Sequence, residues 1–219
     1  MNSAAVAKPY HHGNLRAKLI ETAIDIIRDE GVEAVTLRAL AARIGVSHAA
    51  PYRHFASKRA LLAAIATEGF RLMLDAQREW LDQSPSDPLS QVRATGMAYI
   101  DFAQKHPEHF RIMFGREVGS RSKFPELQAA STPTFMSVVE GVRQCQAQGI
   151  LRTDSPTNIA VMLWAAVHGL TILAMDKQIP ARMNDDRELV RTVGKTMTDA
   201  ITEGFLAADA AQAKAARKA

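Results

Sequence analysis

The sequence contains a single cysteine and no long uninterrupted run of apolar residues. Cys145 is alone among 219 residues, so an intramolecular disulfide and a cysteine-rich zinc site are both excluded. No apolar run reaches the roughly 18 residues that a membrane-spanning helix requires. The first ten residues also lack the apolar segment of a secretory signal. We therefore expect a soluble, cytoplasmic protein that has no membrane partner.

The motifs of common catalytic and metal sites are also missing. There is no glycine-rich phosphate loop, no nucleophile elbow and no convincing set of paired carboxylates. His106 and His109 lie three residues apart, but Pro107 is expected to begin a helix that leaves His106 outside it. We expect no catalytic residue, no metal and no cofactor. A small-molecule enzyme stays open as an alternative, which turnover in a substrate screen would reveal.

Acidic residues are missing from one long stretch of an otherwise ordinary globular composition. The chain is 47% hydrophobic and 23% charged, with a net charge of +4. Between Ala34 and Thr67 there is no Asp or Glu. A basic segment of this kind is typical of a surface that binds nucleic acid. The cations inside this acid-free stretch are Arg38, Arg43, Arg53, Lys58 and Arg59.

Apolar residues recur at helical spacing almost throughout the chain. No alternating strand pattern stands out, and clusters of Pro, Ser, Asp or Gly at 84–88 and 115–123 predict connections. We predict an all-α fold. Its helices cover 15–30, 36–43, 47–55, 58–82, 89–105, 107–114, 156–175 and 186–207, together with one that is broken or bent near Pro133 and ends at Gln148.

The acid-free stretch also carries the pattern of a helix-turn-helix. Thr36 and Ser47 suit the N-caps of two short helices, and Gly45 suits a turn that needs a left-handed backbone. In this motif the second helix, here 47–55, enters the major groove with its N-terminal residues facing base edges. Pro51 falls in the first turn of that helix, where we expect it to stiffen or slightly distort the backbone.

We expect the contacts with DNA to divide by chemistry. Helix N-termini offer free N–H groups to phosphates, and tyrosine and lysine side chains reach the nucleic-acid backbone. A histidine or alanine at the start of the second helix can read a base edge or a thymine methyl. By these rules the residues expected to contact phosphates are Thr36, Ser47, Tyr52 and Lys58. His48 and Ala49 are expected to contact base edges, and Arg53 or His54 to lie near the wall of the groove. Arg38 is a further cation of this surface.

Several fixed spacings in this window resemble the tetracycline-repressor (TetR) family. Further along, Trp164, His168 and Gly169 look like a C-terminal subtype of that family with a Trp-x-x-x-His-Gly signature. The resemblance implies a homodimeric repressor, paired through its last two helices, that a small molecule releases from a palindromic operator in double-stranded DNA. The matching residues of the first window are Thr36, Ala41, Gly45, Val46, Ser47, Tyr52, His54, Phe55, Ser57 and Lys58.

The resemblance also divides the chain into parts. These are an N-terminal arm (1–12), a helix-turn-helix DNA-binding domain (13–58), a helical regulatory and dimerisation domain (59–208) and a tail (209–219). An apolar or aromatic effector would lie in the third part, and ordinary core is the alternative for each of its candidate residues. DNA binding without sequence preference is the alternative for the whole chain. The candidate ligand-binding residues are Tyr99, Phe102, Met113, Phe135, Trp164 and His168.

Overall fold

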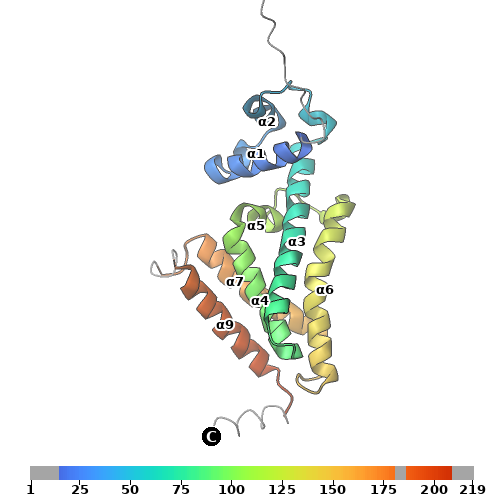
Figure 1. Cartoon of the computed structure of the whole chain (residues 1–219), viewed down its shortest axis with the longest axis vertical. Helices are drawn as coiled ribbons and strands as arrows, with labels where there is room; N and C mark the ends of the chain where they lie inside the picture. Colours follow the sequence, from blue (N-terminus) through green and yellow to red (C-terminus); the bar gives the residue numbers. More distant parts are fainter. Residues whose placement is uncertain (1–14, 181–185, 209–219) are drawn as a thin grey trace, which may run out of the picture.

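A computed structural model describes residues 15–180 and 186–208 of the chain. Within these ranges no strand occurs beyond one isolated antiparallel bridge between Leu151 and Leu206. Figure 1 shows a small unit around α1 and α2 and a longer bundle of helices beneath it. The predicted all-α fold is confirmed, and the expected N-terminal arm and tail lie outside the described residues.

The small unit consists of α1 (Leu15–Glu30), the 3-10 helix η2 (Val32–Ala34) and α2 (Leu37–Ile44). Its interior is filled by the apolar faces that periodicity predicts, since Leu19, Ala23 and Leu40 are fully buried. These side chains share one core with the first turns of the next helix, so the unit is packed directly onto the bundle.

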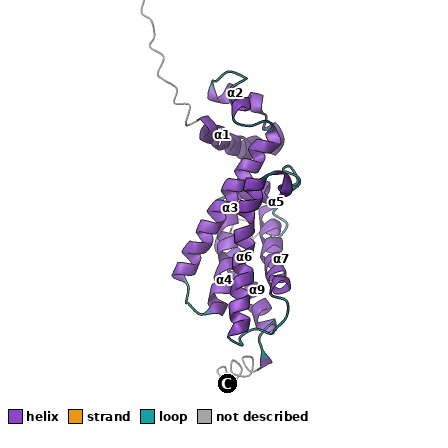
Figure 2. Cartoon of the chain, turned by 90° about the vertical axis from the view of Figure 1, so that its right-hand side faces the viewer, coloured by secondary structure: helices purple, strands orange, loops and turns teal. Residues whose placement is uncertain are grey.

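The bundle consists of α3 (Lys58–Gln83), α4 (Pro88–Lys105), α5 (Pro107–Phe114), the 3-10 helix η4 (Arg121–Lys123), α6 (Pro125–Ala147), α7 (Pro156–Met175) and α9 (Arg187–Gly204). In Figure 1, α3 starts beneath α1 and continues down between α4 and α6. Figure 2 shows from the side that the long helices of the bundle share one general direction. The predicted helices of this part are present, and the largest shift is at α9, which ends at Gly204 rather than at 207.

Pro133 does not break α6. The helix continues through it, although Pro133 has no N–H to donate to the preceding turn. Two side chains bond to other carbonyls of this region: Thr132 Oγ1 donates to the Gln128 carbonyl at 2.9 Å, and Gln77 Nε2 of α3 donates to the Thr134 carbonyl at 3.3 Å. Of the two expectations for this helix, a break or a bend, the break is wrong, and α6 packs against α3 on both sides of its proline.

The short helix α5 connects the two units. Glu108 in its first turn accepts a hydrogen bond from Arg28 Nε of α1 at 3.0 Å. His109 is buried against α3, where its Nε2 lies 3.7 Å from Glu68 Oε1 and has no hydrogen-bond partner. Burial lowers the pKa of His109, and the neighbouring Glu68 opposes this effect only in part.

Acidification is expected to destabilise the fold through His109. Because its pKa is lower in the folded chain, the unfolded chain binds more protons as the pH falls below about 6.5, and the free energy of unfolding falls with it. His109→Asn should reduce the slope of the unfolding free energy against pH by up to about 1.4 kcal/mol per pH unit. His106 and His168 should contribute the slope that remains, because burial also lowers their pKa values. Urea unfolding over a pH series measures the slope. A slope unchanged by His109→Asn would contradict the prediction.

Candidate nucleic-acid interface and ligand cavity

The turn after α2 has the geometry that the sequence predicts. Thr36 Oγ1 accepts the Ala39 N–H at 3.0 Å and so caps α2. Gly45 has a φ of 78°, and its N–H donates to the Ala41 carbonyl at 3.0 Å. A side chain at Gly45 would strain this left-handed backbone. α2 therefore ends sharply, and the chain turns into the segment that begins at Ser47.

The predicted α-helix over 47–55 is wrong, because this segment forms turns and the 3-10 helix η3 (Pro51–Arg53). Pro51 has no N–H to donate to the Ser47 carbonyl, which accepts the Ala50 N–H at 2.9 Å instead. The hydrogen bonds that follow close mostly three-residue turns, and no side chain caps η3. The distortion expected in the first turn therefore extends through most of the segment. We call residues 47–55 the recognition segment.

Two buried residues hold the recognition segment against the small unit. Pro51 is buried, and Phe55 is 4% exposed with the Arg16 guanidinium 5.3 Å from the centre of its ring. Between them Tyr52 is 54% exposed, so its ring and hydroxyl face solvent. Of the predicted DNA contacts, His54 and Lys58 are partly buried, and the exposed ones are Thr36, Arg38, Ser47, His48, Ala49, Tyr52 and Arg53.

The cations around the recognition segment differ in their partners. Arg43 pairs with Glu30 of α1 at 2.7 Å. Arg38 and Arg53 have no carboxylate within 4 Å in the described part of the chain. Exposed arginines that lack an internal partner keep their full set of donors for an external anion. The acid-free stretch thus becomes, in three dimensions, an exposed surface with unpaired positive charge.

Lys58 has a structural role that the sequence did not indicate. Its Nζ donates to the Val32 carbonyl at 2.7 Å and to the Glu33 carbonyl at 3.3 Å, which ties the start of α3 to η2. Glu33 Oε2 also lies 3.9 Å from Nζ, beyond hydrogen-bond distance, so one of the three ammonium hydrogens has no hydrogen-bond acceptor among these groups. No sequence pattern marked this contact, because it joins residues that are about 25 positions apart.

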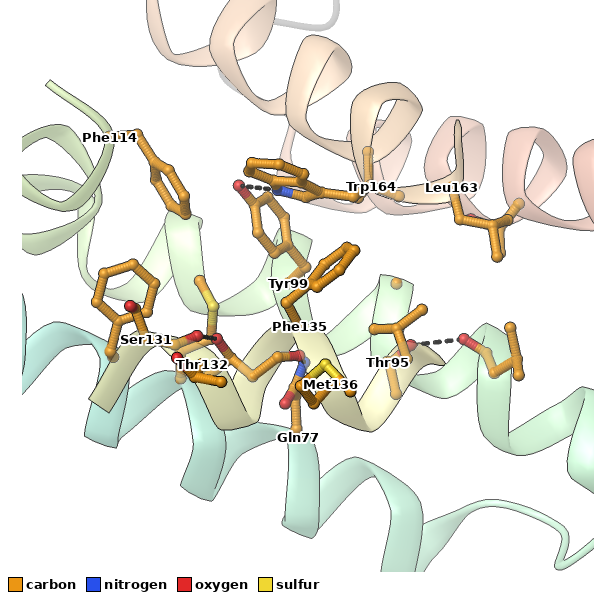
Figure 3. A pocket seen from close by; sticks show the side chains of 18 of the residues that line it. Gln77, Thr95, Tyr99, Phe114, Ser131, Thr132, Phe135, Met136, Leu163 and Trp164 are labelled. Atoms are coloured by element: carbon orange, nitrogen blue, oxygen red, sulfur yellow. Dashed lines mark hydrogen bonds between the residues drawn. The ribbon is translucent and has the colours of Figure 1, made fainter. Parts of the chain in front are cut away.

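A cavity of about 310 Å³ lies between α3, α4, α6 and α7. Figure 3 shows Gln77, Tyr99, Phe135 and Trp164, one from each of these helices, around it. The wall is mostly apolar, with a few polar side chains, as is usual for sites that bind small molecules. We call this space the central cavity.

The predicted ligand-binding residues fall into three groups. Tyr99, Phe135 and Trp164 line the central cavity. Met113 and His168 line a second cavity of about 290 Å³ that shares Phe114, Arg121 and Trp164 with the first. Phe102 lines neither: it is 1% exposed and its ring lies 5.2 Å from that of His106. One turn beyond Tyr99, α4 reaches its corner with α5, where Phe102 is part of the core.

Hydrogen bonds join Trp164, Tyr99 and His168 across α4 and α7. Trp164 Nε1 donates to the Tyr99 hydroxyl at 3.2 Å, and that hydroxyl lies 2.6 Å from His168 Nδ1. Burial raises the pKa of Tyr99 and lowers the pKa of His168. Both groups are therefore neutral, and the Tyr99 O–H donates a hydrogen bond to Nδ1 of the imidazole. The Trp164 N–H and the Tyr99 hydroxyl are satisfied within this network, so mainly the faces of their two aromatic rings are left for a ligand in the central cavity.

Several residues of the central cavity were not singled out in the sequence. Gln77 of α3 and Thr95 of α4 line it, as do Ser131, Thr132 and Thr134 of α6. Arg121 of η4 lines both cavities, although its segment has the composition of a loop. Periodicity identifies apolar faces, so it has no signal for polar residues that enter an otherwise apolar wall.

Two family models match the chain. The first, described as "Bacterial regulatory proteins, tetR family", matches residues 19–65 and contains α2 and the recognition segment. The second, described as "Tetracyclin repressor-like, C-terminal domain", matches residues 92–216 and covers more than half of the chain. The first match thus extends from α1 into the first turns of α3, and the second begins within α4.

Individual proteins match either the small unit or the whole fold. Over 51 residues the chain is 49% identical to the tetracycline repressor protein class C of Escherichia coli, and this match spans 23% of each protein. A solved protein of unknown function from Rhodococcus sp. RHA1 is 30% identical, with a TM-score of 0.76 over 91% of this chain and 99% of that one. AibR, solved with isovaleryl coenzyme A and operator DNA, has the same fold at 21% identity, with a TM-score of 0.64 over 83% of this chain and 96% of its own.

Removing the hydroxyl at the centre of the Trp164–Tyr99–His168 network is expected to destabilise the protein. In Tyr99→Phe the Trp164 N–H and the His168 ring each lose a partner, which costs about 1–2 kcal/mol of unfolding free energy. Urea denaturation measures this loss of unfolding free energy. Tyr52→Phe removes an exposed hydroxyl and should change stability by less than about 0.5 kcal/mol. Equal stability of the two variants would show that the network contributes nothing.

Proposed function

The chain belongs to the tetR family of bacterial regulatory proteins, and we propose that this DNA-binding transcriptional regulator is a homodimeric repressor that a small-molecule ligand releases from a palindromic operator. The observation that carries the proposal is the exposed recognition segment: it contains Arg53 and follows Arg38 of α2 in a stretch without acidic residues, and neither arginine has a carboxylate within 4 Å in the described part of the chain. One copy of such a surface fits one half-site, and two copies related by a two-fold axis fit a palindrome.

We assign the DNA contacts by chemistry and exposure. Tyr52, Thr36, Ser47 and the free hydrogen of Lys58 are assigned to phosphates. His48 and Ala49 are exposed at the start of the recognition segment and are assigned to base edges. Arg53 and His54 follow at the groove wall, with Arg38 adding charge. The 3-10 geometry alters the spacing of these side chains, so we expect the preferred bases to reflect this backbone.

We place the dimer contact on α7, together with α9. By length and composition α7 would be apolar enough to cross a membrane, yet only 33% of its most apolar window is buried. Val161, Ala165, Gly169 and Leu173 follow one another at four-residue spacing, and a Cβ at Gly169 would meet nothing within 4 Å. The opposite face of α7 packs against α4, α6 and α9. A second copy of the chain would cover this apolar stripe, with the glycine permitting close approach.

The path from ligand to DNA follows from the shared helix α3. Phe70, Met73 and Gln77 of α3 line the central cavity, whereas Leu61 and Leu62 at its other end are buried beside the small unit. A ligand that prefers one position of α3 would therefore favour one separation of the two recognition segments in a dimer. A preference of a few kcal/mol suffices to change operator occupancy.

We extend the proposal to domain limits, subtype and location. The DNA-binding domain is assigned to 13–58 and the regulatory domain to 59–208, and the hydrogen bonds of Trp164 and His168 support the Trp-x-x-x-His-Gly subtype. A repressor acts where the DNA is, so we assign the protein to the cytoplasm. No observation favours an enzyme or a DNA-binding protein without sequence preference. Among the described residues no three His, Cys, Asp or Glu side chains are grouped to hold a metal ion.

Arg38→Ala is expected to weaken binding to every DNA sequence. Loss of one phosphate contact should reduce the slope of log affinity against log salt by about one. The measurement is fluorescence anisotropy at several salt concentrations, on an operator selected from genomic DNA by the unaltered protein. Arg78→Ala removes an arginine that pairs with Asp75 on α3, and it should keep the original slope. An unchanged slope for Arg38→Ala would remove Arg38 from the contact set.

Met162→Asp is expected to convert the dimer into a monomer. Met162 is 52% exposed on α7, beside the apolar stripe, and an unpaired carboxylate buried in an apolar interface is costly. Sedimentation velocity distinguishes the two states. Ala129→Asp places the same charge on the exposed side of α6 and should leave the dimer intact. A dimer that persists in Met162→Asp would move the interface away from this part of α7.

A further inference from the structure

Among the residues that the structure describes, Arg121 is the one charged residue that lines the central cavity. The other lining residues described are apolar, aromatic, hydroxyl-bearing or amide side chains, and none of them is acidic. In the described part of the chain no carboxylate lies within 4 Å of the Arg121 guanidinium. A half-buried cation without a counter-charge is costly for a protein to hold, and its presence in a cavity wall calls for an explanation.

The guanidinium of Arg121 is held in place but is far from saturated. Its Nη2 donates to the Met113 carbonyl at 3.0 Å, and its Cζ lies 4.9 Å from the centre of the Phe70 ring and 5.7 Å from that of Phe114. These ring contacts fix the group without using its hydrogens. A guanidinium has five N–H donors, so several remain for an incoming acceptor. Burial also lowers the pKa of Arg121, as expected where no anion offsets the charge.

The other polar side chains of the cavity have largely committed their hydrogens to the protein. The Trp164 N–H is donated to Tyr99, and the Gln77 amide donates to the Thr134 carbonyl. The hydroxyls of Thr95, Ser131, Thr132, Thr134 and Thr198 donate to carbonyls in the preceding turn of their own helices. An acceptor group on a ligand would therefore find its donors mainly on Arg121.

The volume of the cavity limits the apolar part of a ligand. At about 310 Å³ it is about twice the size of an engineered protein cavity of about 150 Å³ that takes up benzene. Phe70, Phe135, Leu163 and Trp164 supply aromatic and aliphatic walls. The space suits a body of about two small rings, or a short chain ending in a ring.

From these contacts we infer that the central cavity binds a small monocarboxylate with an apolar or aromatic body, and that Arg121 holds its carboxylate. Planar guanidinium and carboxylate groups match in a two-hydrogen-bond geometry. Arg121 also bonds to the last turn of α5, and Glu108 in the first turn of α5 pairs with Arg28 of α1. The carboxylate is thus linked through one short helix to the DNA-binding unit. The inference rests on the proposed function only in treating the cavity as the effector site.

Matched acids and alcohols test this inference on the full chain. Isothermal titration calorimetry at a pH of about 7.5, where carboxyl groups are ionised, would compare 4-phenylbutyrate with 4-phenyl-1-butanol and 2-naphthoate with 2-naphthalenemethanol. We expect each acid to bind about tenfold or more tightly than its alcohol, as for a hydrogen bond to a charged group. Arg121→Gln should abolish the difference and Arg121→Lys should retain part of it. Arg116→Gln removes an exposed charge from the same loop and should retain all of it.

The outcomes separate this inference from the proposed function. Equal binding of acids and alcohols by the unaltered chain, no binding of either acid at millimolar concentration, or an acid preference that survives in Arg121→Gln would each overturn the inference. If Arg121→Gln fails to fold, the comparison of acids with alcohols on the unaltered chain still tests whether the cavity prefers a carboxylate. DNA binding is measured separately by anisotropy. A chain that binds an operator but shows no acid preference keeps the proposed function, whereas one that prefers acids but binds no DNA loses it.

Discussion

The packing of one continuous helix, α3, into both units is the constraint on which the molecule depends. Ser57 caps its first turn by accepting the Ala60 N–H at 3.1 Å, and the helix then continues to Gln83 without a proline. At 1.5 Å per residue its 26 residues span about 39 Å. The apolar residues of its first turns share a core with α1, and those beyond its midpoint form a wall of the central cavity. The cavity and the recognition segment are therefore attached to the same stiff element.

A second constraint is how the bundle satisfies polar groups in its interior. Threonines on α4, α6 and α9 return their hydroxyl hydrogens to carbonyls of their own helices, and the Tyr99 hydroxyl is shared between Trp164 and His168. Groups satisfied in this way need no ligand. Arg121 differs, because its charge lies against two aromatic rings with no carboxylate near it in the described chain. That contrast separates a residue suited to bind a ligand from polar residues that belong to the core.

Pro51 shows how far a sequence-based expectation can hold and where it fails. Counting from Ser47 correctly identified the hydrogen bond that proline would forfeit. A single lost bond in a first turn is tolerated in a long helix, because the following turns hold the geometry. The recognition segment is too short for that compensation, so it winds as three-residue turns between buried Pro51 and Phe55. In α6 the opposite occurred: the helix has 23 residues, with regular turns on both sides of Pro133, and it continues through the proline.

The sequence by itself determined the features that depend on neighbouring residues. The caps at Thr36 and Ser57, the left-handed turn at Gly45 and the absence of acid around the recognition segment all follow from residues a few positions apart. Only the tertiary structure decided which side chains meet across helices. Trp164 reaches Tyr99 over 65 positions and Lys58 reaches Val32 over 26, and neither distance is fixed by helical periodicity. Periodicity determines the face of a helix on which a residue lies, whereas its partners depend on how that face packs against the others.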